Sequence, residues 1–242
     1  MNKKILILGA NSDIAKYVIT EFAILKFDLI LCYRKDNQLN DYIDLIKKKF
    51  SINIQSIILD LEKLDLNEIN PKINDLYGII SFAGYLGSQE IALSRFEEVK
   101  KIISINFTNN IKVIEYFKNK LTNSGNEFIA AVTSVAGSRG RKSNFYYGSA
   151  KAALTTYLSG LRFELKQKNI NVITIIPGFV KTKMIKDYKT PKLLTISPER
   201  FSKKIVKNIF KKKSIIYQDF SWLLIDFIIK FIPEMILKKI NF

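Results

Sequence analysis

Two side chains four residues apart, Tyr147 and Lys151, are of types that together suit proton transfer. This spacing places both on one face of a helix. A tyrosine hydroxyl is a weak acid, since its unperturbed pKa is about 10, and a neighbouring ammonium favours the phenolate. Ser134, thirteen residues before Tyr147, could hydrogen-bond a substrate oxygen while Tyr147 delivers its proton. We therefore predict that Ser134, Tyr147 and Lys151 interconvert a carbonyl and an alcohol.

The position of this group in the chain makes it specific. A lone Tyr-x-x-x-Lys would be expected by chance in a lysine-rich chain with 11 tyrosines. Tyr146 offers no alternative, because Ala150 stands four residues beyond it and carries no charge. Ser134 follows one apolar run and Pro177-Gly178 closes the next, which is the order that a nicotinamide site needs.

Short apolar runs alternate with segments of helical period along the chain. The predicted strands are Ile5–Leu8, Leu29–Cys32, Ile54–Leu59, Leu76–Phe82, Phe128–Val132 and Val172–Ile176, and the predicted helices are Ile14–Leu25, Tyr42–Phe50, Ile102–Leu121 and Ala150–Leu165. Continuous apolar strands separated by helices indicate a parallel sheet that is buried on both faces. We predict a doubly wound α/β (Rossmann) fold, which binds ligands at the carboxyl ends of its strands.

Two turns at these strand ends indicate a dinucleotide. Gly9 begins a turn into a helix whose amino terminus could hold a pyrophosphate, although Asp13 would have to point away from it. Arg34-Lys35 follows the second strand, where an NAD site usually has an acidic residue. Arg34 could pair with a 2′-phosphate, so we predict NADP(H) in preference to NAD(H). The alternative is that Arg34 and Lys35 form only an exposed basic turn.

Composition sets broad limits. A chain of 242 residues can form one domain with a sizeable core, and its single cysteine, Cys32, cannot form an internal disulfide. The net charge of +17 would suit an anionic partner, but the chain is rich in lysine, isoleucine and asparagine throughout, so much of the charge could be a solvated surface. We predict a cytoplasmic protein that needs no metal and binds no nucleic acid.

Together these residues resemble the short-chain dehydrogenase/reductase family from Lys3 to about Phe210. The resemblance includes the phosphate turn, an acidic dipeptide Asp60-Leu61, the segment Ser81-Phe82-Ala83-Gly84 and the segment 177–182. It implies that Asn106 holds a water that relays protons from Lys151. The implied catalytic residues are Asn106, Ser134, Tyr147 and Lys151. The implied cofactor-binding residues are Gly9, Asn11, Ser12, Asp13, Ile14, Arg34, Asp60, Leu61, Ala83, Gly84, Tyr147, Lys151, Pro177, Gly178, Val180 and Thr182. Asp13, Ala15 and Ser81 depart from the family pattern, which bears on cofactor affinity.

Segments 11–15 and 135–144 look most like the reductases of decaprenylphosphoryl-erythropentofuranosid-2-ulose, which act on a keto-sugar carried by a polyprenyl phosphate. This resemblance implies a small-molecule or lipid-linked carbonyl substrate. A 3-oxoacyl-thioester reductase is the alternative enzyme. A non-catalytic nucleotide-binding, membrane-associated scaffold is the alternative from another class, and it would usually have lost part of the catalytic group.

We divide the chain into a nucleotide-binding domain, residues 1–215, and an apolar and basic extension, residues 216–242. Residues 220–237 are mostly apolar but are interrupted by four polar or helix-breaking residues, Asp226, Lys230, Pro233 and Glu234, so they suit a transmembrane helix poorly. Residues 220–239 could instead lie peripherally on the inner face of a membrane, or pack within the domain or a homo-oligomer. A possible lid, residues 181–197, carries five lysines, and with Arg139, Arg141 and Lys142 it would give a basic rim suited to a phosphorylated substrate.

Overall fold

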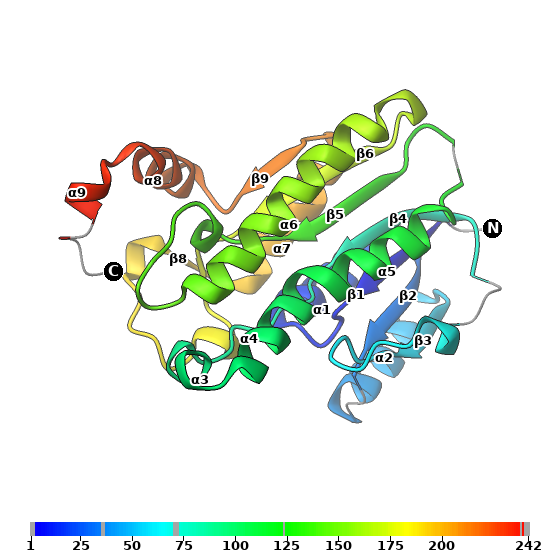
Figure 1. Cartoon of the computed structure of the whole chain (residues 1–242). Helices are drawn as coiled ribbons and strands as arrows, with labels where there is room; N and C mark the ends of the chain where they lie inside the picture. The colour runs from blue at the N-terminus through cyan, green and yellow to red at the C-terminus, as the bar shows by residue number, and fades with distance from the viewer. Residues whose placement is uncertain (1–2, 35–36, 70–72, 123, 238, 240–242) are drawn as a thin grey trace.

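The computed structural model describes residues 3–34, 37–69, 73–122, 124–237 and 239 (Figure 1). Within these residues a seven-stranded sheet has the order β3-β2-β1-β4-β5-β6-β9, and every neighbouring pair is parallel. Its strands are β1 (Lys4–Leu8), β2 (Asp28–Tyr33), β3 (Ile54–Ile58), β4 (Leu76–Ser81), β5 (Phe128–Val132), β6 (Asn171–Ile176) and β9 (Ile215–Tyr217). The predicted doubly wound α/β fold is confirmed.

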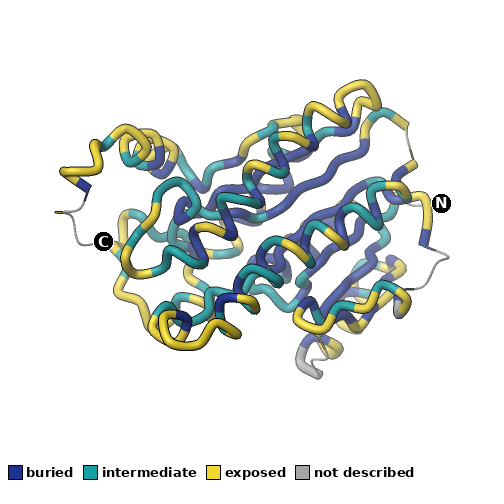
Figure 2. Tube along the Cα trace, in the orientation of Figure 1, coloured by how far each residue is buried: buried dark blue, intermediate teal, exposed yellow. Residues whose placement is uncertain are grey.

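Helices cover both faces of the sheet (Figure 1). One face carries α1 (Asp13–Ile24), α2 (Asn37–Phe50) and α7 (Pro198–Phe210), and the other carries α5 (Asn109–Lys118) and α6 (Phe145–Glu164), with α3 (Gln89–Ser94) and α4 (Phe96–Ile103) beside α6. Short 3-10 turns occupy Leu66–Glu68, Val135–Gly137, Lys166–Lys168, Lys183–Ile185 and Lys192–Leu194. The strands between these layers are buried along most of their length (Figure 2).

Apolar spacing explains how the helices attach to the sheet. In α1, Ile14, Val18 and Phe22 recur every four residues and are buried. In α6, Leu154, Leu158 and Leu161 recur after four and three residues and are buried against the opposite face of the sheet. These stripes remove apolar area from water, which is the main favourable term in folding. The apolar period of the sequence therefore fixes which side of each helix meets the sheet.

The predicted helix Ile102–Leu121 is wrong in its bounds. The helix begins earlier, at Phe96, and α4 and α5 are joined by a π-helical turn, Ser104–Thr108. This turn contains Asn106, whose buried amide group bonds to the backbone of a neighbouring loop. Because an apolar pattern is almost the same for α- and π-helix over one turn, the sequence could not show the change.

The elements α3, α7 and β9 were not predicted from the sequence. The start of α7 carries a recognisable signal, because the Ser197 hydroxyl accepts a hydrogen bond from the Arg200 N–H and Pro198 follows at the first helical position. Strand β9 has only three residues beside a lysine-rich turn, and the division predicted between residues 215 and 216 falls inside it.

The last described segment is helical and projects from the edge of the sheet beyond β9 (Figure 1). It contains α8 (Phe220–Phe231) and α9 (Glu234–Leu237), which are separated by Ile232 and Pro233. Among the described residues, no helix combines the length and the apolar character needed to cross a bilayer. Positions 238 and 240–242 of the predicted extension lie outside the described residues. The possible lid contains β8 (Thr195–Ile196), which pairs with β7 (Phe179–Val180).

A glycine is required at the end of β1. Gly9 has a φ of +75°, and a Cβ atom there would lie 2.7 Å from the backbone nitrogen of Ala83. Its N–H also donates to the Cys32 carbonyl at 2.8 Å. The ends of β1, β2 and β4 therefore meet around one residue that can carry no side chain.

We predict opposite effects for two glycine-to-alanine changes. Gly9→Ala should lower the free energy of unfolding by more than about 2 kcal/mol, because the new methyl meets backbone atoms in a left-handed conformation. Gly160→Ala is the matched control, since Gly160 lies in α6 with no atom within 4 Å of the added methyl. It should raise stability by about 0.5–1 kcal/mol. Urea unfolding measures both, and equal effects would contradict the packing described for Gly9.

Candidate active site

A cavity of about 480 Å³ lies at the carboxyl ends of the strands. Its wall includes Ser134 and each residue predicted to bind cofactor: Gly9, Asn11, Ser12, Asp13, Ile14, Arg34, Asp60, Leu61, Ala83, Gly84, Tyr147, Lys151, Pro177, Gly178, Val180 and Thr182. Asn106 is the one predicted site residue outside this wall. The structure thus gathers residues from the ends of the sheet around one space, and their roles remain predictions.

The turn after β1 can accept an anion. Ser12 is the N-cap of α1 in an extended conformation, and its hydroxyl makes no capping hydrogen bond. Asp13 accepts a hydrogen bond from the backbone N–H of Lys183 at 2.7 Å, so its carboxylate is bonded to the possible lid. Because the amino end of a helix attracts negative charge, phosphate oxygens could take the place of a side-chain cap here. The residues of this turn fit a dinucleotide.

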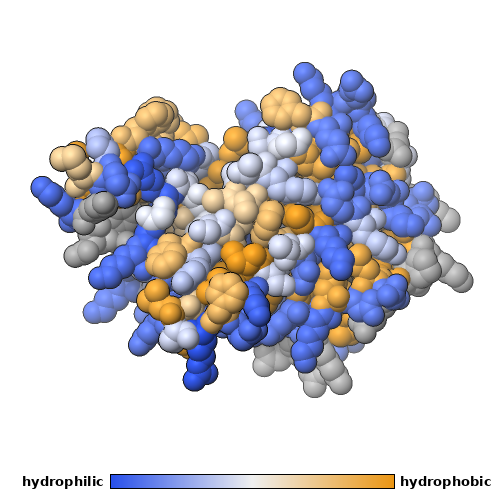
Figure 3. Space-filling view, in the orientation of Figure 1, coloured by the Kyte–Doolittle hydropathy of each residue, from blue (hydrophilic) through white to orange (hydrophobic). Residues whose placement is uncertain are grey.

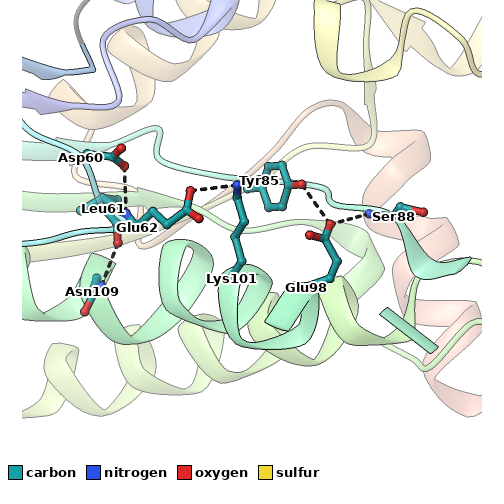
Figure 4. Close-up of polar contacts among 8 residues, drawn as sticks. All are labelled: Asp60, Leu61, Glu62, Tyr85, Ser88, Glu98, Lys101 and Asn109. Carbon is teal, nitrogen blue, oxygen red and sulfur yellow. Dashed lines mark hydrogen bonds and ion pairs between the residues drawn. The ribbon is translucent and has the colours of Figure 1, made fainter. Parts of the chain in front are cut away.

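Another part of the cavity wall is formed by the turns after β2 and β3. Arg34 is exposed there, and its carbonyl accepts a hydrogen bond from the Asn11 amide at 3.4 Å. Asp60 accepts from the Glu62 N–H, and the Leu61 carbonyl accepts from Asn109 (Figure 4). Lys35 lies outside the described residues. A guanidinium group in this part of the wall could meet a ribose phosphate.

Three of the predicted catalytic side chains, Ser134, Tyr147 and Lys151, line the same cavity. Tyr147 is buried and its hydroxyl is hydrogen-bonded to Ser134. The Lys151 Nζ lies 5.7 Å from the centre of the Tyr147 ring and donates to the carbonyl of Val132 at 3.0 Å and that of Ala83 at 3.4 Å. Since Val132 ends β5 and Ala83 follows β4, the lysine is held between two adjacent strand ends.

Burial controls the acidity of both groups. It raises the pKa of Tyr147 to about 12, against a smaller lowering by the hydrogen bond to Ser134. It lowers the pKa of Lys151 to about 7. The expectation that Lys151 brings the pKa of Tyr147 toward neutrality is not met in this structure, because removal from water disfavours the charged form of each group. At neutral pH, Tyr147 therefore keeps its proton.

Asn106 lies beside this group without lining the cavity. Its amide N–H groups donate to the carbonyls of Tyr85 and Ile102 at 2.7 and 2.8 Å, and its Oδ1 accepts from the Tyr85 N–H at 3.2 Å. A Cβ on Gly84 would lie 3.4 Å from both the Asn106 Oδ1 and the Lys151 Nζ. The amide group is thus committed to the backbone, and it holds the loop after β4 next to the lysine.

Comparison with known proteins agrees with this geometry. Residues 3–192 match the family described as short chain dehydrogenase. The chain belongs to the short-chain dehydrogenase family. An uncharacterised oxidoreductase of Mycobacterium tuberculosis is 26% identical over 196 residues, 78% of each chain. An NADP-dependent 3-hydroxy acid dehydrogenase of Schizosaccharomyces pombe is 28% identical over 193 residues, 74% of this chain and 72% of the relative.

Solved structures of short-chain dehydrogenases share the fold. One from Sphingobium yanoikuyae, in complex with NADPH, superposes with a TM-score of 0.81 at 19% identity and covers 96% of this chain and 97% of its own. A bulky-bulky ketone specific alcohol dehydrogenase from Comamonas testosteroni gives a TM-score of 0.80 at 18% identity, covering 96% of this chain and 95% of its own. At these identities the likeness concerns the fold alone.

Two departures from the family pattern have local explanations in this short-chain dehydrogenase. Ser81, at the end of β4, donates to the Asn110 Oδ1 at 2.8 Å and accepts from the Ala83 N–H, so it is satisfied within a buried network. The Asp13 carboxylate is bonded to Lys183, as described above. Neither side chain is therefore left as an uncompensated polar group.

Gly178 has a packing role that was not predicted from the sequence. A Cβ there would lie 1.9 Å from the indole ring of Trp222 on α8, and the Gly178 N–H donates to the Gln218 side chain at 3.1 Å. The indole N–H donates to the Leu194 carbonyl at 2.9 Å. The segment 177–182, whose Pro177, Gly178, Val180 and Thr182 were predicted to bind the cofactor, is therefore fixed against α8, and α8 is bonded to the possible lid.

The cavity wall also contains polar residues that were not assigned from the sequence as catalytic or cofactor-binding residues, among them Arg141 and Asn144. Arg141, predicted only as part of a basic rim, lines the wall, and burial lowers its pKa. Asn144 precedes α6, and its buried Oδ1 has no partner among the described residues. Asn144 is three residues before Tyr147, so the same helical spacing that identified Lys151 could have indicated it.

Tyr85 also lines the cavity and is held from outside it (Figure 4). Its hydroxyl donates to the Glu98 carboxylate at 2.9 Å, and the Ser88 N–H donates to the same oxygen at 3.0 Å. Lys101 is paired with Glu62 at 2.8 Å and lies 5.0 Å from the centre of the Tyr85 ring. Helix α4 thus connects the loops after β3 and β4, which flank the cavity.

The buried lysine predicts a pH-dependent cost to folding. Lys151 has a pKa of about 7 in the fold, below its ordinary value of 10.5, so between these values the unfolded chain binds a proton that the folded chain does not. Stability then rises with pH across this window, and the cost is complete below about pH 7. The stability of Lys151→Met relative to the wild type should therefore decrease between about pH 6 and pH 9.

Urea unfolding of the cofactor-free protein, followed by circular dichroism, measures this difference. Lys142→Met is the matched control, because Lys142 is exposed and three residues from the α6 start. Its stability relative to the wild type should not change over the same pH range. A constant difference for Lys151→Met would show that the lysine is charged in the fold at both pH values.

Proposed function

We propose that this short-chain dehydrogenase is an NADP(H)-dependent enzyme that reduces a carbonyl group to an alcohol. The observation that carries the proposal is the buried tyrosine in the wall of the cavity, bonded to Ser134 with Lys151 alongside. The wall of the same cavity includes strand ends suited to a dinucleotide and the side chains of Asn144 and Arg141. A cofactor and a carbonyl compound could therefore approach the same hydroxyl.

The reaction needs a hydride and a proton. NADPH, when bound, supplies the hydride to the carbonyl carbon. Tyr147 holds a proton at neutral pH because burial raises its pKa to about 12, and it donates this proton to the carbonyl oxygen. Ser134 orients that oxygen by a hydrogen bond, and the Lys151 ammonium stabilises the phenolate left on Tyr147. Asn106 positions the loop that holds the lysine, and a water beside it would return a proton.

Arg34 supports the choice of the phosphorylated cofactor. Its guanidinium stands at the end of β2, where a 2′-phosphate would lie, and the part of the cavity wall that this strand end contributes, Cys32 to Arg34, contains no acidic residue. The relative from Schizosaccharomyces pombe is named as NADP-dependent, and the neighbour from Sphingobium yanoikuyae is a complex with NADPH. A bidentate pair between arginine and phosphate favours NADPH over NADH.

The substrate side of the cavity supports a polar, anionic carbonyl compound. Arg141 contributes a positive charge in a partly dehydrated wall, and the Asn144 Oδ1 could accept a hydrogen bond from a sugar hydroxyl. Arg139 is two residues before Arg141, but its guanidinium is paired with Glu234, so it helps to hold the C-terminal segment in place. We infer a phosphorylated keto-sugar, such as the polyprenyl-phosphate keto-sugars of the decaprenylphosphoryl-erythropentofuranosid-2-ulose reductases.

Tyr147→Phe tests the mechanism. Turnover should fall by at least about a hundredfold, because the proton donor is removed. NADPH affinity should change little, since the ring and Lys151 remain. Loss of NADPH absorbance with a ketopentose phosphate measures turnover, and the unphosphorylated ketopentose tests for recognition of the anion. Tyr146→Phe is the matched control outside the cavity wall. Substantial turnover by Tyr147→Phe would overturn the assignment.

Arg34→Ala tests the cofactor. Calorimetric titration should show the Kd for NADPH raised about tenfold to a hundredfold, because a charge-assisted pair with phosphate is lost. The Kd for NADH should be unchanged. Arg200→Ala is the control for removing an exposed positive charge from elsewhere on the surface. If both cofactors lose affinity equally, Arg34 does not read the 2′-phosphate.

A further inference from the structure

The outer side of α8 and α9 is an apolar surface without a partner among the described residues. It consists of exposed large side chains, here called the docking face: Phe220, Leu223, Leu224, Phe227, Ile228, Phe231, Met235 and Ile236. In α8 these side chains recur every three or four residues, which is the spacing of the stripe that a helix normally turns toward a core. Figure 3 shows apolar side chains gathered over this helix.

The side of α8 that packs on the protein is partly polar. Trp222 and Asp226 are its buried residues, and the Asp226 carboxylate bonds to Ser138, to Tyr217 at 2.6 Å and to Lys230 at 2.7 Å. Arg139 joins the same segment by its ion pair with Glu234 at 2.7 Å. A buried carboxylate with these partners fixes the rotation of the helix. These contacts therefore hold α8 with its docking face toward solvent.

Exposed lysines lie on the lid, which is bonded to α8, and on the loop before α6; together they are called the cationic border. Acidic groups between residues 220 and 237 are neutralised locally, because Asp226 is buried and Glu234 is paired. The possible lid is attached to α8 through the Leu194 carbonyl, and its Leu193 is 97% exposed. The exposed basic residues of the lid and the neighbouring loop are Lys142, Lys181, Lys183, Lys186, Lys189 and Lys192. Apolar side chains with a cationic border match the chemistry of an anionic membrane surface.

We propose that the docking face binds the surface of an anionic lipid bilayer, with α8 lying in the interfacial plane. A helix of 12 residues is too short to span a bilayer, but it is long enough to lie parallel to the surface of the bilayer in the headgroup region. A second copy of the chain is the less favoured occupant, because each copy carries a net charge of +17 and pairing the faces would bring two cationic borders together. This inference does not depend on the proposed reaction.

Co-sedimentation of the full chain with vesicles tests the proposal. The wild type should bind phosphatidylcholine vesicles that contain about one quarter phosphatidylglycerol, and much less should bind phosphatidylcholine alone. Raising NaCl from about 50 mM to about 500 mM should weaken the binding, because salt screens the cationic border. These measurements on the wild type need no variant to fold, and equal binding to neutral vesicles would overturn the choice of an anionic surface.

A pair of variants separates the docking face from general surface hydrophobicity. Phe227→Asp with Phe231→Asp changes side chains that are 59% and 71% exposed, and Phe96→Asp with Phe163→Asp changes side chains that are 68% and 77% exposed elsewhere. The first variant should lose about tenfold or more of the vesicle affinity, whereas the second should keep most of it. Thermal unfolding confirms that each is folded.

Analytical ultracentrifugation tests whether a second copy of the chain occupies the docking face. Equal vesicle binding by the two double variants would overturn the proposal. It would also be overturned if the wild type bound no vesicles and formed a dimer that only the Phe227 and Phe231 changes dissociate, because the docking face would then be an interface between copies.

Discussion

The reversal of strand order between β1 and β4 is the constraint on which the site depends. From β1 the chain winds outward through β2 to β3, and from β4 it winds the other way through β5 and β6 to β9. The connecting helices therefore leave on opposite faces, and the carboxyl ends of β1 and β4 are free of a crossover between them. Gly9 makes this opening possible, because a side chain there would collide with the backbone that follows β4.

A buried lysine gives the opening its chemistry. The same carbonyls that hold the Lys151 ammonium, at Ala83 and Val132, belong to adjacent strand ends, so the charge is located by the sheet and not by a flexible surface. Burial disfavours the charged form of each group, so Tyr147 keeps its proton and the pKa of Lys151 is lowered. As in many active sites, burying these ionisable groups lowers the stability of the fold and leaves a proton available for transfer.

Much of this arrangement could be predicted from the sequence, because it follows from local patterns. The predicted strands overlap β1 to β6, and residues at their ends, from Gly9 to Thr182, line one cavity. Long-range contacts could not be predicted in this way. The bond from Lys183 to Asp13 joins residues 170 positions apart, and the space beside Gly178 is filled by Trp222. The same limit applies to the π-helical turn at Asn106, since one partner of its amide group, Tyr85, belongs to another loop.

These long-range contacts connect features that look separate in the sequence. Gly178 packs under Trp222, Trp222 bonds to the lid at Leu194, and the lid bonds to the phosphate turn through Asp13. A displacement of α8 would therefore be transmitted to the lid and to the turn after β1 through these contacts. If the docking face lies on a membrane, the cavity beside the lid is held near lipid. A lipid-linked carbonyl compound could then reach Tyr147 while its lipid stays in the bilayer.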